Sequence, residues 1–200
     1  MRSSFFLCLL LLMTSASYAD DSEPDHAIHE ELRGVFRSIE DAINARRYDD
    51  LAPYFHERLR VTTINQEIIS ARPEIAGYFN RWFGPGGYLK SLEIHLNADA
   101  LTELSADKTF GVVRGSGIEN YILADGRNFD MKTRWTATVI KDTDGAWRIL
   151  ALHIGTNFLD NPILSAAENA LRYFTAGGVA VGLAIGAIGG WLFGRRKRTQ

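Results

Sequence analysis

The segment that most constrains the fold spans residues 129–158, which read as two strands joined by a tight turn. Runs rich in β-branched and aromatic residues flank Asp144-Gly145, and Asp-Gly between such runs is a strong hairpin signal. Two strands alone bury too little surface to be stable in water. We therefore expect further strands and an amphipathic helix to cover one face of this hairpin.

The chain before the hairpin supplies these elements. Apolar side chains recur at helical spacing over 25–47, and Pro73 begins a second helix with an aromatic face. Between the two helices, a short helix is expected at 48–55 and a small hairpin at 60–70. Two longer strands are expected after the second helix, at 92–98 and 110–123. This order predicts an α+β domain with a curved antiparallel sheet wrapped on three N-terminal helices.

Three stretches resemble the nuclear transport factor 2-like superfamily, with the SnoaL-like and ketosteroid-isomerase-like domains as the most similar branch. They are YDDLAPYF at 48–55, the helix PEIAGYFNRWF, and DGAWRI at 144–149 with His153. The resemblance covers about residues 25–162. It implies a sheet wrapped on helices around a cone-shaped pocket. Members of this superfamily include enzymes, binding modules and assembly domains, so the fold alone does not define the function.

The two ends of the chain differ from this domain. Residues 1–19 combine Arg2, an apolar run and the small-x-small site Ser17-Tyr18-Ala19, which is typical of a secretory signal peptide; the alternative is a retained N-terminal anchor. Cys8 is the single cysteine, so the exported domain, residues 20–162, would be stable without disulfides.

The C-terminal part predicts a membrane helix. A juxtamembrane helix at 163–174 leads into residues 175–194, which carry no charge and are long enough to span the hydrocarbon core. The basic tail at 195–200 marks the cytoplasmic side. The domain is then expected on the exported, periplasmic or extracytoplasmic side of a single-pass membrane protein. A tail of this composition also resembles bacterial sorting tails that are removed by cleavage.

Glycines recur at every fourth position within the predicted span, at Gly178, Gly182, Gly186 and Gly190. Such a row lets two helix backbones approach closely, and homodimers are common in the superfamily, so we expect a homodimer. The alternative is that glycine is simply frequent in membrane helices.

The charge of the domain limits its partners. All 24 acidic residues lie between Asp20 and Glu168, whereas 17 of the 22 basic residues lie between Arg33 and Arg172, so residues 20–172 carry a net charge of −7. Proteins that bind nucleic acid usually present a basic face. We therefore expect no nucleic-acid partner.

Two candidate site residues, Arg134 and His153, lie on the two strands of the hairpin. Their relative placement depends on the turn. A two-residue Asp144-Gly145 turn places both on one face of the sheet, whereas a three-residue loop that begins at Thr143, with a bulge, places Arg134 beside Ile154. The sequence leaves both alternatives open.

The chemistry of these two residues also has two readings. Arg134 would bind an anionic group in an apolar pocket, or pair with Asp130 or Glu119 for structure. His153 would act as a general base, or form a hydrogen bond at a sheet surface or dimer contact.

Tyr54, Tyr121 and Asp130 complete the candidate pocket residues. The resemblance to steroid isomerases implies that a tyrosine hydroxyl and carboxyl groups polarise a carbonyl in an apolar pocket; the alternative for each is a structural role. His26 and His29 are spaced like a metal pair but have no matched third ligand. We predict neither a metal nor a cofactor.

These observations predict a membrane-anchored exported domain that binds a small apolar or weakly anionic ligand or serves as an assembly module. The pocket is inferred from apolar residues at Trp82, Phe83, Leu150 and Leu152. The alternative is a SnoaL-like isomerase, cyclase or hydrolase that acts on a lipid-like molecule.

Overall fold

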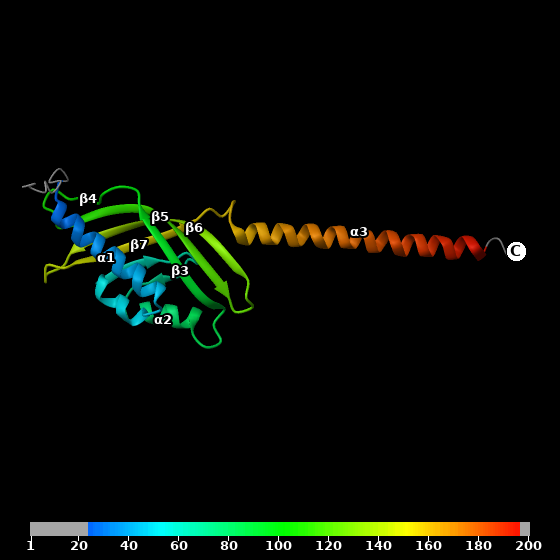
Figure 1. The fold of residues 1–200 in the computed structure, drawn as a ribbon, viewed down its shortest axis with the longest axis horizontal. Coiled ribbons are helices and arrows are strands. Elements are labelled where there is room, and N and C mark those ends of the chain that lie inside the picture. Colours follow the sequence, from blue (N-terminus) through cyan, green and yellow to red (C-terminus); the bar gives the residue numbers. More distant parts are fainter. Residues whose placement is uncertain (1–23, 197–200) are drawn as a thin grey trace, which may run out of the picture.

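The computed structural model describes residues 24–196, which form an α+β domain followed by one long helix (Figure 1). The predicted signal peptide at 1–19 and residues 197–200 of the basic tail lie outside the described residues. Three helical segments come near the start of the domain: α1 (His26–Asn44), the 3₁₀ helix η1 (Tyr48–Tyr54) and α2 (Arg72–Phe83). The strands are β1 (Phe55–Thr62), β2 (Ile68–Ile69), β3 (Leu89–Ala98), β4 (Glu103–Leu104), β5 (Phe110–Leu123), β6 (Asn128–Lys141) and β7 (Trp147–Thr156).

The strands form one mixed sheet in the order β2-β1-β7-β6-β5-β3, and β4 pairs with β5. Every pair is antiparallel except β1 and β7, which run parallel. The prediction of a purely antiparallel sheet is therefore wrong at this pair. The sequence between β1 and β7 holds α2 and five strands, and a connection of that length allows the parallel pairing that no tight hairpin permits.

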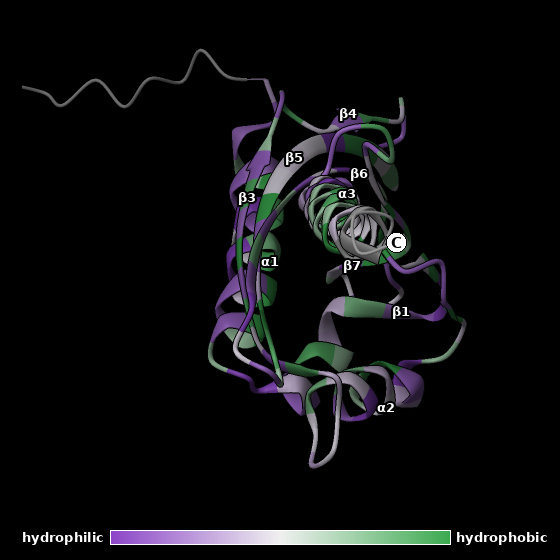
Figure 2. Cartoon of the chain, turned by 90° about the vertical axis from the view of Figure 1, so that its right-hand side faces the viewer, coloured by the Kyte–Doolittle hydropathy of each residue, from purple (hydrophilic) through white to green (hydrophobic). Residues whose placement is uncertain are grey.

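The helices cover one face of the curved sheet, which we call the inner face. Figure 2 shows the curvature of β5 and β6 and the position of α1 beside β3. The main core lies where α1, η1 and α2 meet β1. Leu51 and Leu59 are its most completely buried large side chains, and Tyr48 stacks on Phe79 with ring centroids 4.3 Å apart. The three predicted helical segments thus supply much of the core.

Side chains of α1 occupy the free edge of β3. Asn44 Nδ2 donates to the Ile94 carbonyl at 2.9 Å, and Asn44 Oδ1 accepts the Ile94 N–H at 2.7 Å. Glu40 Oε2 accepts the N–H of Leu96 at 3.0 Å. These side chains take the place of a neighbouring strand, and an edge covered in this way is protected against pairing with another chain.

Replacing Asn44 is expected to test this edge contact. Asn44→Ala leaves an N–H and a carbonyl of β3 without their partners, so the free energy of unfolding should fall by about 1–2 kcal/mol. Denaturant unfolding followed by circular dichroism measures the change. Arg37→Ala, at an exposed position of the same helix, is the control and should change stability by less than about 0.5 kcal/mol. Equal stability of the two variants would show that the edge contact is not stabilising.

The β6–β7 hairpin has the longer loop of one predicted alternative, but it places Arg134 and His153 on one face of the sheet, as the other alternative predicted. Lys141 pairs with Trp147, so the connection is longer than two residues, and Gly145 adopts a φ of 82° at the position that favours glycine. A second irregularity follows, because Val139 pairs with Ile149 but Thr138 pairs with Ala151. The bulge at Leu150 shifts the register by one residue. Arg134 then pairs with Gly155, on the face that also holds His153.

One side chain fixes the tip of this hairpin. The Arg148 guanidinium donates to Asp142 at 2.9 Å and to Asp144 at 2.6 Å, and its Nε donates to the Pro53 carbonyl at 3.1 Å. The guanidinium lowers the pKa of the Asp144 carboxyl, chiefly through this hydrogen bond. The turn is thereby attached to η1.

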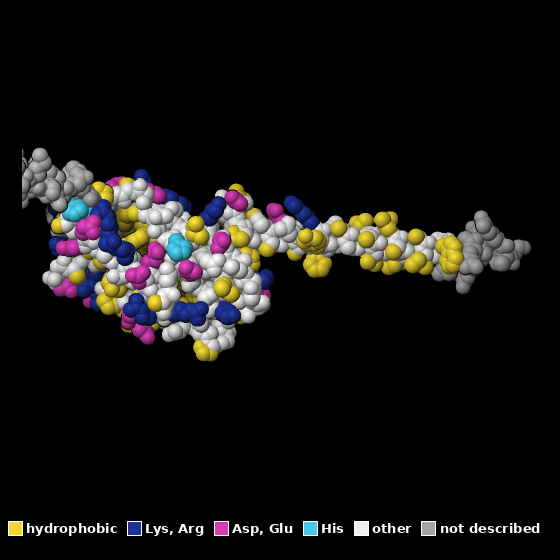
Figure 3. Space-filling view, in the orientation of Figure 1, with side chains coloured by type: hydrophobic (Ala, Val, Ile, Leu, Met, Phe, Trp, Pro, Cys, Tyr) yellow, Lys and Arg dark blue, Asp and Glu magenta, His cyan; other side chains and the backbone are white. Residues whose placement is uncertain are grey.

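The long helix α3 (Pro162–Arg196) follows the sheet and extends away from the domain (Figure 1). Its residues 162–191 are long and apolar enough to cross a membrane, and none of the most apolar part of this helix is buried against the domain. The predicted juxtamembrane helix and the predicted span belong to this one continuous helix. Figure 3 shows charged side chains near its beginning and mainly apolar ones further along.

Candidate functional site

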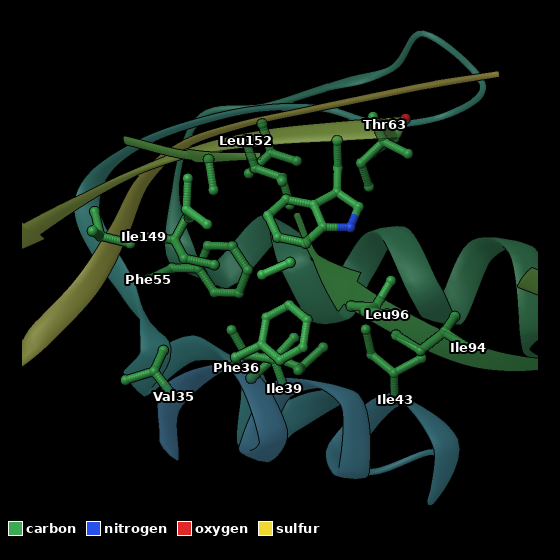
Figure 4. A pocket seen from close by; sticks show the side chains of 18 of the residues that line it. Val35, Phe36, Ile39, Ile43, Phe55, Thr63, Ile94, Leu96, Ile149 and Leu152 are labelled. Carbon is green, nitrogen blue, oxygen red and sulfur yellow. The ribbon is translucent and has the colours of Figure 1, made fainter. Parts of the chain in front are cut away.

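A cavity of about 400 Å³ lies between the helices and the inner face of the sheet. Figure 4 shows apolar side chains from α1, β3 and β7 pointing into the same space, among them Phe36, Ile94 and Leu152. The walls also include side chains of α2, β5 and β6. Most of the lining is aliphatic or aromatic, so the cavity favours an apolar molecule.

Glycine on the inner face of β5 makes room for a large side chain in the wall. A Cβ atom at Gly115 would lie 2.2 Å from the Trp135 ring. The Trp135 indole N–H donates to the Ser116 carbonyl at 3.0 Å, and its ring packs on Phe36 at a centroid distance of 5.6 Å. The absence of a side chain at Gly115 therefore decides where the indole lies and shapes the cavity.

One part of the cavity wall carries a buried carboxyl. Glu119 of β5 is 6% exposed and lines the cavity together with Tyr121, whose hydroxyl donates to the Glu119 carboxylate. Burial raises the pKa of Glu119, while the hydroxyls of Tyr121 and Thr133 partly oppose the shift. Burial also raises the pKa of Tyr121 well above its usual value, and the neighbouring Glu119 carboxylate adds to this. The pair therefore favours a neutral tyrosine and an acid that gives up its proton reluctantly.

Polar side chains from two other segments adjoin this pair. Tyr78 of α2 and Thr63 after β1 both line the cavity, and the Tyr78 hydroxyl donates to Asn65 Oδ1 at 3.1 Å. Burial is the largest cause of the raised pKa of Tyr78, and the charge of Glu119 contributes to it. We call Glu119, Tyr121, Tyr78 and Thr63 the polar corner of the cavity.

The cavity has a second polar region on α1, where His29 and Arg33 contribute to the lining. Arg33 pairs with Glu30 at 2.5 Å. His29 is buried. Among residues 24–196 no group of three His, Cys, Asp or Glu side chains is arranged to hold a metal ion.

The structure places the sequence-predicted site residues in different regions. Tyr121 lines the cavity. Arg134 lies on the outer face, where it donates to Asp99 at 3.0 Å rather than pairing with Asp130 or Glu119. Asp130 accepts from Asn120 at 2.6 Å on the exposed side of the sheet. His153 is exposed, and Tyr54 packs against the main core and does not line the cavity.

Of the four apolar residues from which the pocket was inferred, some line the cavity and others do not. Leu152 lines the cavity, whereas Leu150 forms the bulge of β7. Trp82 and Phe83 of α2 do not line the cavity, and the Trp82 indole N–H donates to Glu67 at 2.8 Å. Ile149, Leu152 and Ile154 face inward because the bulge interrupts the alternation of the strand.

Glu119 is a buried, ionisable cavity residue that the sequence analysis did not place in the pocket. The alternation of side chains along the strand could have indicated its inward position, since Glu119 shares a face of β5 with Tyr121 and Leu123. The opposite face of this strand carries Phe110 and Ile118, which are 48% and 50% exposed. Hydrophobicity alone would therefore have favoured the wrong inner face of β5.

Comparison with known proteins relates this geometry to solved structures. No family model and no curated protein matches the sequence. A Novosphingobium aromaticivorans protein assigned as an aromatic ring hydroxylase matches with a TM-score of 0.57 at 14% identity, over 67% of this chain and 92% of that one. A protein assigned as a scytalone dehydratase from the same organism matches with a TM-score of 0.54 at 15% identity, over 66% and 85% of the two chains.

A third similar structure is a ketosteroid isomerase-like protein from Erwinia carotovora atroseptica. Its TM-score is 0.55 at 9% identity, over 66% of this chain and 97% of that one. At identities this low the likeness extends to the fold and not to the activity. The fold of this chain agrees with these three structures over 85–97% of their length, and the domain has the nuclear transport factor 2-like fold.

Proposed function

We propose that the domain binds a small, largely apolar molecule in its cavity and is held outside a membrane by α3. The observation that carries the binding function is the apolar cavity of about 400 Å³ with its polar corner at Glu119 and Tyr121. A cavity of this size accommodates an ordinary small-molecule ligand. The polar corner supplies orientation, while the apolar wall supplies most of the binding free energy.

The anchor is supported by the composition of α3. The uncharged stretch from residue 175 onward and the basic residues that follow it fit a membrane span with its C-terminus in the cytoplasm. The exposed helix surface needs a nonaqueous environment, because nothing in the described domain covers it. Together with the predicted signal peptide, this composition supports the proposal that the domain lies on the exported side.

Binding is tested with the full-length chain in lipid nanodiscs. An apolar fluorescent probe is expected to bind above the level of empty nanodiscs, and Ala137→Phe is expected to reduce this binding at least tenfold. Ala137 lies on the inner face of β6 and lines the cavity, so the larger ring would occupy part of the space. Thr136→Phe, at an exposed position one residue away, is the control. Equal binding by all three proteins would refute a ligand cavity.

A second candidate function is acid–base catalysis on a small apolar substrate. It is favoured by the raised pKa of the buried Glu119 carboxyl and its contact with Tyr121, since catalytic carboxyls are commonly tuned in this way. For any substrate found, Glu119→Gln should lower kcat at least a hundredfold while KM changes little. Retention of turnover in this variant would leave the binding function as the better explanation.

We also propose that α3 pairs with a second copy of itself along the glycine row. Gly182→Leu places a large side chain in the middle of this row and is expected to lower dimerisation at least tenfold, because the backbones can no longer approach. Energy transfer between labelled chains in liposomes measures it. Ala184→Leu, which lies off the row, serves as the control; an equal loss in both variants would argue against the row as the contact.

A further inference from the structure

The hydroxyl groups of the polar corner already donate their protons within the protein. The Tyr121 hydroxyl donates to Glu119, and the Tyr78 hydroxyl donates to Asn65 Oδ1 at 3.1 Å. Thr63 Oγ1 donates to the same amide oxygen or to the Glu67 carbonyl oxygen. Each hydroxyl has a single proton. What these side chains offer to the cavity is therefore oxygen lone pairs.

The direction of these hydrogen bonds follows from the contacts of Asn65 and Thr63. Asn65 Nδ2 donates to Glu67 Oε1 at 2.8 Å, and an ionised carboxylate only accepts, so the amide oxygen is the atom that faces the hydroxyls. Thr63 Oγ1 accepts the Glu67 N–H at 3.1 Å. Its own proton is directed either to Asn65 Oδ1 or to the Glu67 carbonyl oxygen, which lies 3.2 Å away, and in both cases to a protein acceptor.

Glu119 has no positively charged partner in the described part of the chain. None of the ion pairs formed within residues 24–196 includes it. The cavity-lining cation Arg33 pairs with Glu30 instead. A buried carboxylate without a cation is unfavourable, and a cationic ligand would reduce that cost.

We propose that the ligand is a compact apolar amine whose ammonium group binds at Glu119 and the hydroxyl oxygens of Tyr121 and Tyr78. This inference rests on the proposed binding function and names its ligand class. An ammonium group supplies three N–H donors and a positive charge to this set of acceptors. The tyrosine rings add a favourable surface for a cation. The apolar remainder of the ligand lies against the aliphatic wall.

The same arrangement disfavours other polar groups. A ligand carboxylate would face the lone pairs and the charge of Glu119, and like charges close together are repelled. A ligand carbonyl needs donors, whereas Tyr121, Tyr78 and Thr63 have already directed their protons to protein acceptors. A neutral alcohol can donate one hydrogen bond but brings no charge. The expected order of affinity is amine, then alcohol, then ketone and carboxylate.

Four adamantane derivatives test this order with one apolar cage and different polar groups: 1-adamantylamine, 1-adamantanol, 2-adamantanone and 1-adamantanecarboxylate. Each is titrated into the full-length chain in nanodiscs of zwitterionic lipid at pH 7.5 by calorimetry, with empty nanodiscs as the blank. The amine is expected to bind at least tenfold more tightly than the alcohol, and the carboxylate most weakly. Tighter binding of the alcohol, ketone or carboxylate than of the amine would overturn the inference and leave the cavity as a binding site.

Two variants assign the preference to the polar corner. Glu119→Gln should reduce the preference for the amine over the alcohol to less than threefold. Glu93→Gln removes the same charge on the outer face, where the Glu93 side chain is 63% exposed, and should keep the preference. A preference that persists in Glu119→Gln would overturn the inference. If none of the four probes binds above the blank and Ala137→Phe has no effect on the apolar probe, the proposed binding function fails as well.

Discussion

Gly115→Ala is expected to destabilise the domain by about 3 kcal/mol or more, because the added methyl group has no room. Its Cβ would lie 2.1 Å from the Asn97 carbonyl oxygen and 2.2 Å from a ring carbon of Trp135. Moving the indole would cost stability, since it is buried, packs on Phe36 and donates a hydrogen bond to the Ser116 carbonyl. The free energy of unfolding is measured by denaturant titration of the full-length chain in mild detergent.

Gly155→Ala provides the matched control for this substitution. Gly155 also lies in a strand, and a Cβ atom there would meet no atom within 4 Å, so the same chemical change should alter stability by less than about 0.5 kcal/mol. The apolar probe should also bind more weakly to Gly115→Ala, because the displaced indole forms part of the cavity wall. If the two alanine variants unfold at the same denaturant concentration, the close contact at Gly115 does not constrain the fold.

Glu119→Gln is expected to stabilise the domain by about 2 kcal/mol at pH 8, since it removes a buried carboxyl that must ionise. Burial raises the pKa of Glu119 in the folded state above its ordinary value of 4.5. The folded protein then binds more protons than the unfolded chain, so stability declines as the pH rises above that value. The decline should stop above the folded-state pKa.

The pH dependence separates this effect from a general change in packing. The stability gained by Glu119→Gln should be small near pH 4 and should grow with pH, as followed by thermal unfolding between pH 4 and pH 9. Glu93→Gln, which changes an exposed carboxyl, should show no such growth. A stability difference between Glu119→Gln and the unmodified chain that is independent of pH would mean that the carboxyl does not titrate under the influence of burial.

Local sequence patterns correctly predicted most of the secondary structure. The predicted strand at 110–123 is β5, and the helical spacing over 25–47 corresponds to α1. These features depend on alternation, helical period and turn residues, which act between neighbours in the chain. The Asp-Gly signal likewise located the β6–β7 turn, where Gly145 has positive φ.

The candidate site was predicted less well, because it depends on which face of each strand points inward. Arg134 and His153 were identified by their chemistry, yet both lie on the outer face. A bulge at Leu150 interrupts β7, and no residue type in the strand predicts this bulge. The apolar side chains of Phe110 and Ile118, which are exposed, made the opposite face of β5 look like the inner one, so the inward position of Glu119 was not predicted.

The sequence by itself determined the α+β order of the elements, the hairpin at its centre and the long, largely apolar helix at its end, because each depends on residues close together in the chain. The tertiary structure decided the parallel pairing of β1 with β7 and which face of β5 points into the cavity. It also brought Glu119, Tyr121, Tyr78 and Thr63 together at one corner of the cavity. These outcomes depend on register and on packing between segments distant in sequence. A shift of one residue in register moves every side chain of a strand to the other face, so local patterns could not define the site.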